Sequence, residues 1–447
     1  MKEGVILSDA AKTVIERLNE YGFEGYAVGG CVRDSLLGLT PHDYDVTTDA
    51  PPEETLEIFK DFTVVKTGIK HGTVTVVINK EPIEVTTFRC DGEYSDGRHP
   101  EKVSFTKSLS EDLMRRDFTV NAMAYSEKSG LVDLFDGQSD LKNGIIRTVG
   151  SPEDRFNEDA LRILRALRFA STYDFKIEEN TGKAILKLKE SLTLLSAERI
   201  FSELKRLIVG VGAERILTEY SSVFAVILPE IKESIGFLQN TPYHLYDVYT
   251  HSVKTLAACP PDTVLRLAAL LHDCGKPETY KEENGVGHFF GHVAVSTEKA
   301  RVALNRLKSD NATRDAVISL VKYHDADISE TEKSVKRWLG RLTPEIFERL
   351  IDLKIADNSA KTEESKKRLQ KYENIKKIMK GILEREECFS LRQLKINGSD
   401  LIALGFPKGR QIGEVLNSLL EKVIAGECEN EREALRATAR RVDSRDV

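Results

Sequence analysis

The sequence contains few cysteines and no Cys-x-x-Cys pair. Its six cysteines are scattered along 447 residues, so the spacing excludes both a disulfide framework and a thiolate zinc site. Long apolar runs are also missing, since a run such as residues 223–228 falls far short of the ~20 residues that cross a membrane. The first residues show no signal-peptide core. We therefore expect a cytoplasmic protein with reduced thiols.

The chain has no excess of positive charge. Its 65 Lys and Arg residues are outnumbered by 72 Asp and Glu residues, which gives a formal net charge of −7. Indiscriminate binding of nucleic acid through whole-molecule charge is therefore excluded, and an RNA partner would have to be held by local basic stripes and by shape. A chain of this length is too long for one core and predicts about three units.

A glycine pair follows the first apolar strand. Residues 26–28 lead into Gly29 and Gly30, and the apolar positions after them predict that a helix opens there. Backbone N–H groups of such a turn can approach a phosphate without obstruction by Cβ, and a helix start favours anions. Arg33 adds a fixed positive charge. The pattern predicts a phosphate-binding turn.

Two carboxylates follow on the next predicted strand. Asp43 and Asp45 are two residues apart, so they project from the same face of a strand. Two carboxylates side by side repel one another unless a cation binds between them, and Mg²⁺ prefers oxygen ligands. Glu84 on a later strand is either a third ligand or a cross-strand charge. The pair predicts a magnesium site for a nucleoside triphosphate.

These residues carry a family resemblance. Residues 29–38 read Gly-Gly-x-Val-Arg-Asp-x-Leu-Leu-Gly and precede Asp-x-Asp, which resembles the nucleotidyltransferase head of the bacterial class II CCA-adding enzymes and bacterial poly(A) polymerases. The resemblance implies an α+β fold, in which a small mixed-sheet head is followed by an all-helical neck, a helical metal-binding domain and a helical tail. The domains we expect are 1–150 (head), 151–229 (neck and body), 230–360 (metal-dependent phosphohydrolase-like domain) and 361–447 (tail, tRNA binding).

A polar segment at residues 89–100 has no apolar face and predicts a mobile loop. The resemblance implies that this loop serves the change from adding C to adding A. Its full length argues against a relative that adds only the two cytidines.

Residues 111–124 contain more polar and charged side chains than a helix that only packs against the core requires. We predict that Arg116 and Asn121 contact the triphosphate or ribose and that Asp117 orients them, because this run matches the second motif of the family. A charged capping cluster is the alternative.

A single long helix is predicted from residue 151 to about residue 169, with Pro152 in its first turn. Four polar residues recur on it every three positions, and their pattern Glu-Asp-x-x-Arg-x-x-Arg is similar to that of the family. They are Asp159, Arg162, Arg165 and Arg168.

This helix predicts how bases are selected. Cytosine and adenine both present an amino donor beside a ring-nitrogen acceptor, which matches Asp159 as acceptor and Arg162 as donor and opposes uracil and guanine. Arg165 and Arg168 would hold phosphate or stack. Arg199, in a further family motif, is expected to brace the helix. A salt-bridged amphipathic helix is the alternative.

The histidines define a second constellation. Nine histidines occur in the chain, and six of them fall within residues 244–324. Imidazole and carboxylate groups in the order His…His-Asp…His…His…Asp resemble the HD phosphohydrolase superfamily, which implies a divalent or transition metal and hydrolysis of phosphoesters. The predicted ligands are His251, His272, Asp273 and Asp357, with His292 and His324 for a second metal or a phosphate. A scaffold that only positions tRNA is the alternative.

In the tail, Lys408 and Arg410 lie among glycines and could grip an RNA phosphate; a turn between helices is the alternative.

The resemblance implies template-independent addition of CCA to the 3′ end of tRNA from CTP and ATP, with release of pyrophosphate. Three alternatives remain open. The chain could add only the terminal A, it could be a poly(A) polymerase, or it could be mainly an HD-type hydrolase with an RNA-binding head.

Overall fold

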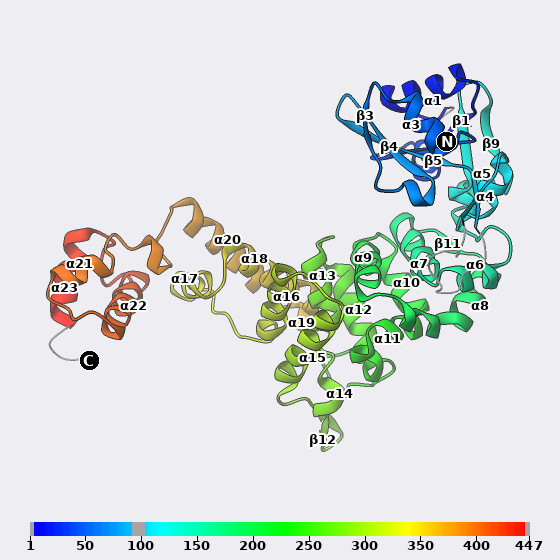
Figure 1. The fold of residues 1–447 in the computed structure, drawn as a ribbon. Helices are drawn as coiled ribbons and strands as arrows, with labels where there is room; N and C mark the ends of the chain where they lie inside the picture. The colour runs from blue at the N-terminus through cyan, green and yellow to red at the C-terminus, as the bar shows by residue number, and fades with distance from the viewer. Residues whose placement is uncertain (1–3, 92–102, 443–447) are drawn as a thin grey trace. The chain divides into compact units, whose positions relative to one another are not determined.

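The amino-terminal part of the chain is organised around one seven-stranded sheet (Figure 1). Its strands are β1 Gly25–Val28, β2 Tyr44–Thr48, β3 Thr63–Val65, β4 Thr73–Ile78, β5 Glu81–Thr87, β8 Met123–Ser126 and β9 Gly130–Asp133. They lie in the order β3-β4-β5-β2-β1-β8-β9. Only β2 and β5 run parallel, and the other neighbours are antiparallel. The mixed sheet and the α+β class are therefore confirmed.

This computed structural model describes residues 4–91 and 103–442. The chain divides into two compact units, Met1–Pro229 and Glu230–Val447. The predicted mobile loop at 89–100 lies outside the described residues from position 92 onward.

Alternation along the strands builds the core of the sheet. Burial alternates along β4 and β5, where Val74, Val76, Ile83 and Val85 are buried, as expected for a sheet with one covered face. Helices α1 Asp9–Glu20 and α3 Pro52–Ile58 pack on these strands and their neighbours. The remaining elements of the head are α2 Gly30–Leu36, η1 Ile69–His71, β6 Arg89–Asp91, β7 Val103–Phe105, α4 Leu109–Met114, η2 Thr119–Asn121, α5 Gly137–Asn143 and β10 Ile145–Ile146.

The rest of this unit is helical. Its elements are α6 Pro152–Glu158, α7 Leu161–Tyr173, β11 Lys176–Ile177, α8 Glu179–Leu188, η3 Lys189–Leu194, α9 Ala197–Ile208, α10 Ala213–Glu219 and α11 Ser221–Ile227. The apolar faces of α7 and α9 pack together, with Leu164, Leu167, Leu204 and Leu207 buried.

The predicted single helix over residues 151–169 is wrong. The chain breaks at Asp159, whose backbone is extended with φ −144° and ψ 104°. The Asp159 carboxylate accepts a hydrogen bond from the N–H of Leu161 at 3.0 Å and so satisfies an amide at the start of α7. An aspartate that bonds nearby backbone N–H groups favours a helix start over a helix interior. Asp159 therefore does not share a helical stripe with the arginines of α7.

The second unit is almost entirely helical. Its first elements are η4 Pro229–Ser234, α12 Val248–Ala258, α13 Thr263–Leu271, α14 Lys276–Thr279, β12 Lys281–Glu283, β13 Val286–His288, α15 His292–Arg306, α16 Asn311–Tyr323, α17 Glu332–Arg341 and α18 Pro344–Ser359. Helices α12, α13, α16 and α18 pack on one another. The mostly apolar helix α13, with Leu267 and Leu270 buried, lies against the other three.

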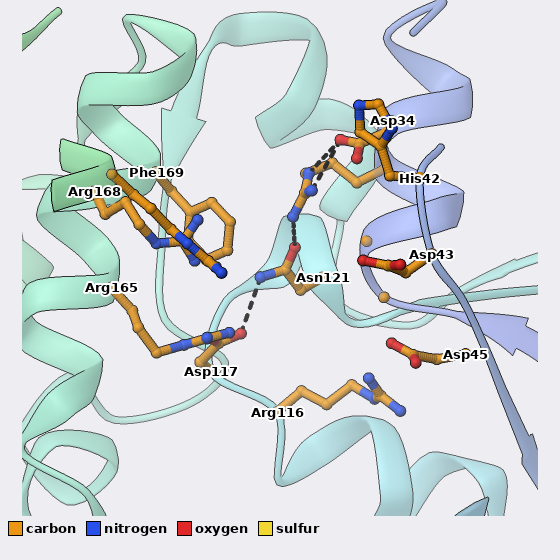
Figure 2. Close-up of a pocket in the computed structure, with 14 residues that line it drawn as sticks. Asp34, His42, Asp43, Asp45, Arg116, Asp117, Asn121, Arg165, Arg168 and Phe169 are labelled. Carbon is orange, nitrogen blue, oxygen red and sulfur yellow. Dashed lines mark hydrogen bonds and ion pairs between the residues drawn. The ribbon is translucent and has the colours of Figure 1, made fainter. Parts of the chain in front are cut away.

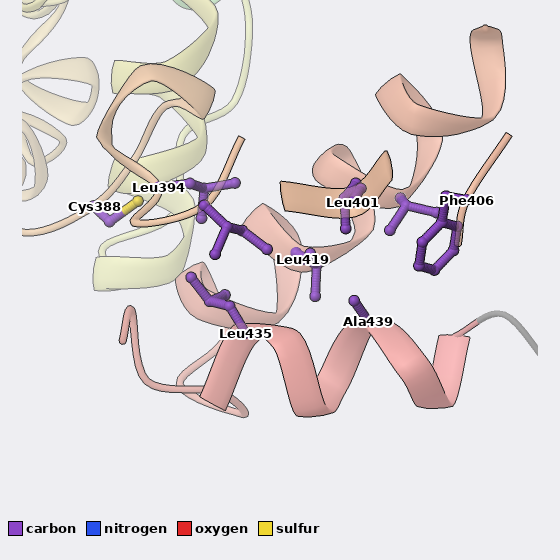
Figure 3. Close-up of a cluster of buried hydrophobic side chains, with 9 residues drawn as sticks. Cys388, Leu394, Leu401, Phe406, Leu419, Leu435 and Ala439 are labelled. Atoms are coloured by element: carbon purple, nitrogen blue, oxygen red, sulfur yellow. The ribbon is translucent and has the colours of Figure 1, made fainter. Parts of the chain in front are cut away.

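A smaller core lies toward the carboxyl end. The elements there are α19 Glu363–Lys366, α20 Leu369–Glu384, η5 Leu391–Gln393, α21 Gly398–Ala403, α22 Arg410–Ile424 and α23 Arg432–Val442. Figure 3 shows Leu401, Leu419 and Leu435 from these helices together with Phe406 from the connection between α21 and α22, and all four are buried.

Among the residues that the structure describes, no helix combines the length and the apolar character needed to span a membrane.

Candidate functional sites

A cavity of about 500 Å³ opens beside the glycine turn of the first unit. Figure 2 shows the arginines of α7 on one side of it and Asp43 and Asp45 on the other. The residues that line it are Gly29, Gly30, Arg33, Asp34, His42, Asp43, Asp45, Arg116, Asp117, Asn121, Arg165, Arg168, Phe169 and Arg206.

The two acids lie where strand alternation predicts. Asp43 and Asp45 are exposed to the cavity, whereas Tyr44 between them is buried. Desolvation, followed by the charge of Glu84 on the neighbouring strand, raises the pKa of Asp45 to about 6, although Arg116 opposes the shift. Excess negative charge on oxygen ligands is what a divalent cation would neutralise. The donor set therefore fits Mg²⁺.

The glycine turn needs its glycine. Gly29 has φ +76°, and a Cβ there would lie 3.3 Å from Nη1 of Arg116. A side chain at this position would therefore be strained and would press on a cation that lines the cavity.

Arg33 is bound by protein groups rather than offered to a ligand. Its guanidinium pairs with Asp34 at 2.8 Å and donates to Asn121 Oδ1 at 2.6 Å. It also lies over the rings of Phe169 and Tyr173, at 5.0 and 5.1 Å from their centroids. Arg33 therefore fixes the shape of the wall.

Asp117 continues this network. Its carboxylate accepts from Asn121 Nδ2 at 3.1 Å and pairs with Arg165 at 2.6 Å. Burial opposes ionisation of Asp117, but Arg165 and Asn121 outweigh burial and lower its pKa to about 2. The network thus joins the head to helix α7.

Arg116 has hydrogen-bonding capacity to spare. One end of its guanidinium pairs with Asp112 at 3.2 Å. Its Nε atom is buried and has no hydrogen-bond partner within residues 4–91 and 103–442. A buried unsatisfied donor is costly, and this one belongs to a residue that lines the cavity, where a ligand phosphate could accept from it.

Sequence reasoning missed four lining residues: Asp34, His42, Phe169 and Arg206. Arg168 pairs with Glu203 at 2.5 Å and lies 3.9 Å from the ring centre of Phe169. Arg206 comes from α9, and in the sequence it is only one of two basic residues near the end of an amphipathic helix. No local pattern marks it.

Asp159 and Arg162 are not among the residues that line this cavity. Asp159 pairs with Arg199 at 2.7 Å, which agrees with the expected bracing role of Arg199. Arg162 pairs with Glu158 and donates to the carbonyl oxygen of Arg115 at 3.0 Å. To contact a base edge, these side chains would have to exchange their present partners.

The second unit gathers the predicted histidine cluster. Nε2 of His251 lies 2.9 Å from Oδ1 of Asp357 and 3.7 Å from Oδ2 of Asp273. Nε2 of His272 lies 3.1 Å from Oδ2 of Asp273 and 3.7 Å from Oδ1 of Asp357. Four residues therefore converge from helices α12 and α18 and from the end of α13.

Asp273 joins this group to a second one. Its other oxygen, Oδ1, lies 3.5 Å from Nε2 of His292 and 3.5 Å from Nε2 of His324. The two imidazole nitrogens are 3.4 Å apart. Two sets of side chains could each hold an ion, one made of His251, His272 and Asp357 and the other of Asp273, His292 and His324.

Backbone carbonyls orient these imidazoles. The Nδ1 atoms of His272, His292 and His324 donate to carbonyl oxygens three residues earlier, at 2.8, 2.8 and 2.7 Å. Each Nε2 is thereby left as the ligand atom, as in metal-bound histidines. Nε2 of His272 is buried with no hydrogen-bond partner. The residues present fit a metal.

The carboxylates of the cluster are ionised. Burial opposes this, but neighbouring donors and cations, among them Lys276 beside Asp273 and Lys361 beside Asp357, outweigh it and hold the pKa values of both carboxyls well below their usual range. Lys276 lies 2.7 Å from Asp273. His244, which sequence reasoning did not select, lies with His251 and Asp273.

The tail residues lie on a connection between helices. Lys408 is exposed in the turn before α22, and the exposed side chain of Arg410 pairs with Glu414 at 2.9 Å. The turn between helices that was the alternative is present, and phosphate binding there stays a prediction.

Three family models match the chain: the Poly A polymerase head domain over residues 25–147, the probable RNA and SrmB-binding site of polymerase A over 174–235, and the putative tRNA nucleotidyltransferase domain 2 over 279–439.

Full-length relatives match as well. The CCA-adding enzyme of Ligilactobacillus salivarius is 33% identical over 444 residues, covering 97% of this chain and 96% of the relative. That of Enterococcus faecalis is 34% identical, with coverage of 97% and 96%.

Solved structures share the fold. The crystal structure of the Bacillus stearothermophilus CCA-adding enzyme in complex with CTP superposes with a TM-score of 0.72 at 29% identity, covering 97% of this chain and 96% of that one. The Thermotoga maritima CCA-adding enzyme complexed with tRNA gives 0.61 at 21% identity, with coverage of 97% and 95%.

Proposed function

The chain belongs to the family of CCA-adding enzymes, and from this premise we propose how its residues add CCA to the 3′ end of tRNA from CTP and ATP. The observation that carries the proposal is the cavity in which Asp43 and Asp45 face a wall of arginines. Acids that hold a cation and arginines that hold phosphates are the two requirements of nucleotidyl transfer.

Nucleotidyltransferases of this family use a divalent metal, and Asp43 and Asp45 would hold Mg²⁺. When bound, Mg²⁺ neutralises phosphate charge and lowers the pKa of the attacking 3′ hydroxyl. The protein supplies the remaining contacts. Arg116 lines the cavity and would donate from its guanidinium to a phosphate oxygen, and Gly30 lets the backbone approach. Because pyrophosphate leaves with extra negative charge, Arg168 and Arg206 on the cavity wall would favour its departure.

The bonded network sets the position of the nucleotide rather than touching the reacting atoms. Arg33, Asn121, Asp117 and Arg165 are tied to one another or to protein acids, so their conformations are fixed before a ligand enters. A wall organised in advance reduces the entropy that binding costs.

Base selection remains assigned to Asp159 and Arg162. Together they offer the acceptor and donor that cytosine and adenine require and that uracil and guanine do not. Their present partners, Arg199 and Glu158, would be released when a nucleotide binds.

The test uses purified full-length protein with tRNA that ends before CCA. Each nucleotide is supplied singly and in combination, and product ends are sequenced. CTP alone should add two cytidines, and CTP with ATP should complete CCA. Addition of A only to tRNA that already ends in CC would identify an A-adding enzyme, and a run of adenosines would identify a poly(A) polymerase.

For the second unit we propose a metal-dependent phosphohydrolase site. His251, His272, Asp273 and Asp357 would hold one ion, and His292 and His324 with Asp273 a second. A bound ion would activate water for attack on a phosphoester. Lys276 and Lys361 lie close enough to the carboxylates to receive substrate phosphate.

Metal content separates this proposal from a purely structural role. Full-length protein and His272→Ala are loaded with Mn²⁺, Ni²⁺ or Zn²⁺, dialysed and analysed for bound metal, with hydrolysis of p-nitrophenyl phosphate as the second readout. The matched control is His288→Ala, because His288 stacks on Phe290 and is not part of the cluster. Equal metal content in His272→Ala and the unaltered protein would contradict the proposal.

The remaining assignments are proposals too. The division at residues 150, 229 and 360, the contact of Lys408 and Arg410 with RNA, and a cytoplasmic location follow from the sequence and the family.

A further inference from the structure

Helix α17 in the second unit carries a row of cations on one exposed face. Lys333, Arg337 and Arg341 are four residues apart and all exposed, so they project from the same side of the helix over about 12 Å. Like charges at this spacing destabilise a helix unless something neutralises them. The row is therefore a candidate binding surface for an anionic partner.

The protein itself neutralises only part of the row. Arg337 pairs with Glu421 at 2.6 Å. In the part of the chain that the structure describes, neither Lys333 nor Arg341 pairs with a carboxylate. The other charges of α17 are paired, since Lys336 lies 2.5 Å from Glu387. Two exposed cations thus remain unneutralised in a chain of net charge −7.

The row borders two hollows that meet. A cavity of about 260 Å³ is lined by all three cations and by the hydroxyl residues Ser329, Thr331 and Ser334, together with Trp338. A second of about 380 Å³ shares Arg337 and Arg341 with it. Among the described residues, Glu421 is the one acid that lines either hollow. Hydroxyls and cations together are the donors that phosphates accept from.

The platform under the row is rigid. Arg341 lies over the Trp338 ring at 4.9 Å from its centroid. Trp338 is buried and packs on Tyr323 and on Phe347, with centroids 5.3 and 6.2 Å away. An arginine stacked on an anchored ring loses little freedom when it binds.

We propose that this face of α17 binds backbone phosphates of the tRNA substrate, as an anchor that reads no sequence. This rests on the proposed function, since it takes tRNA as the partner. RNA is favoured because a polyanion can meet three cations in a row, whereas a single anion would meet one or two.

The test measures binding of tRNA lacking CCA by fluorescence anisotropy at several salt concentrations, with the full-length protein. Lys333→Gln/Arg341→Gln should raise the Kd about 10-fold at physiological salt and reduce the slope of log Kd against log salt by about 1–2. Arg301→Gln/Arg314→Gln is the control, because those arginines pair with Glu298 and Asp315, and it should change the Kd less than about 2-fold.

A further variant is expected to change the Kd in the opposite direction. Glu421→Gln removes the acid that lines the hollows and should lower the Kd several-fold by releasing Arg337. Unchanged Kd and slope in the double variant would overturn the proposal. Binding is measured without nucleotide, so it is independent of catalysis. If the unaltered protein does not incorporate CTP, but the double variant still binds tRNA more weakly than the unaltered protein, only the proposed function is contradicted.

Discussion

Arg116 is the side chain whose unused hydrogen-bonding capacity best matches a bound phosphate. We expect Arg116→Lys to lower kcat/KM for CTP about 10- to 100-fold, because a lost charge-assisted hydrogen bond costs roughly 1.5–3 kcal/mol. Steady-state incorporation of labelled CTP measures this. Arg147→Lys is the control, since Arg147 pairs with Asp140 and is not among the residues that line the cavity. An unchanged kcat/KM in Arg116→Lys would remove Arg116 from the site.

The pair of Asp117 and Arg165 predicts a dependence of stability on pH. The folded-state pKa of Asp117 is depressed to about 2 from the model-compound value of 3.8, so its ionisation stabilises the fold above about pH 4, and this contribution is lost as pH falls toward 2. The difference corresponds to about 2 kcal/mol.

Urea unfolding of Asp117→Asn and the unaltered protein should therefore differ most at pH 7 and converge as pH falls from 4 to 2. Asp154→Asn, on an exposed acid, should follow the unaltered protein throughout. A difference independent of pH would show that the pair does not act through its charge.

Local motifs made much of the cavity predictable at this scale. The glycine turn and the acid pair depend on neighbours in the sequence, so Gly29, Asp43 and Asp45 could be identified from spacing. Arg206 could not be, because its place beside Arg168 depends on how α9 packs on α7. The unpartnered Nε of Arg116 likewise appears only in three dimensions.

Among the secondary-structure elements, the break between α6 and α7 was the main surprise. Helical spacing continues through residues 151–169, and nothing in the periodicity marks a boundary. The side chain of Asp159 competes for the Leu161 amide, and its pairing with Arg199 from α9 holds it there. Tertiary contacts thus overrode local propensity.

The helices at the carboxyl end give a prediction about packing. Leu435 on α23 is fully buried in the cluster of Figure 3, so Leu435→Ala should destabilise these helices by about 2–5 kcal/mol. Amide hydrogen exchange of residues 394–442 would report it as faster exchange. Ile402→Ala, on the partly exposed Ile402 of α21, should cost less than about 1 kcal/mol. Equal protection in Leu435→Ala would contradict the observed core.

At the scale of the whole molecule, the two sites are built from separate units. All residues of the nucleotide cavity fall within Met1–Pro229, and all residues of the histidine cluster fall within Glu230–Val447. The histidines could be grouped from sequence because their density there is high and two of them, His272 and His324, follow directly on helices α13 and α16. That Asp273 lies between the two groups of histidines, and that His244 lies beside them, could be seen only in the fold.

This separation predicts independent loss of function. Asp43→Ala/Asp45→Ala should abolish CTP incorporation and keep the metal content of the second unit. His272→Ala should keep CTP incorporation and lower the metal content of the second unit. Elemental analysis and incorporation on the same preparations measure both. If circular dichroism shows that His272→Ala is folded and this variant nevertheless loses CTP incorporation, the two sites are not independent.

The central claim is that two protein side chains, Asp159 and Arg162, select the nucleotide without a template strand. Single-turnover incorporation of CTP and of UTP onto tRNA lacking CCA tests it most directly. The account predicts that CTP is incorporated at least about 100-fold faster than UTP, as expected when a mismatched hydrogen-bonding edge costs several kcal/mol, and that Asp159→Ala narrows the difference. Equal rates for CTP and UTP in the unaltered protein would contradict it.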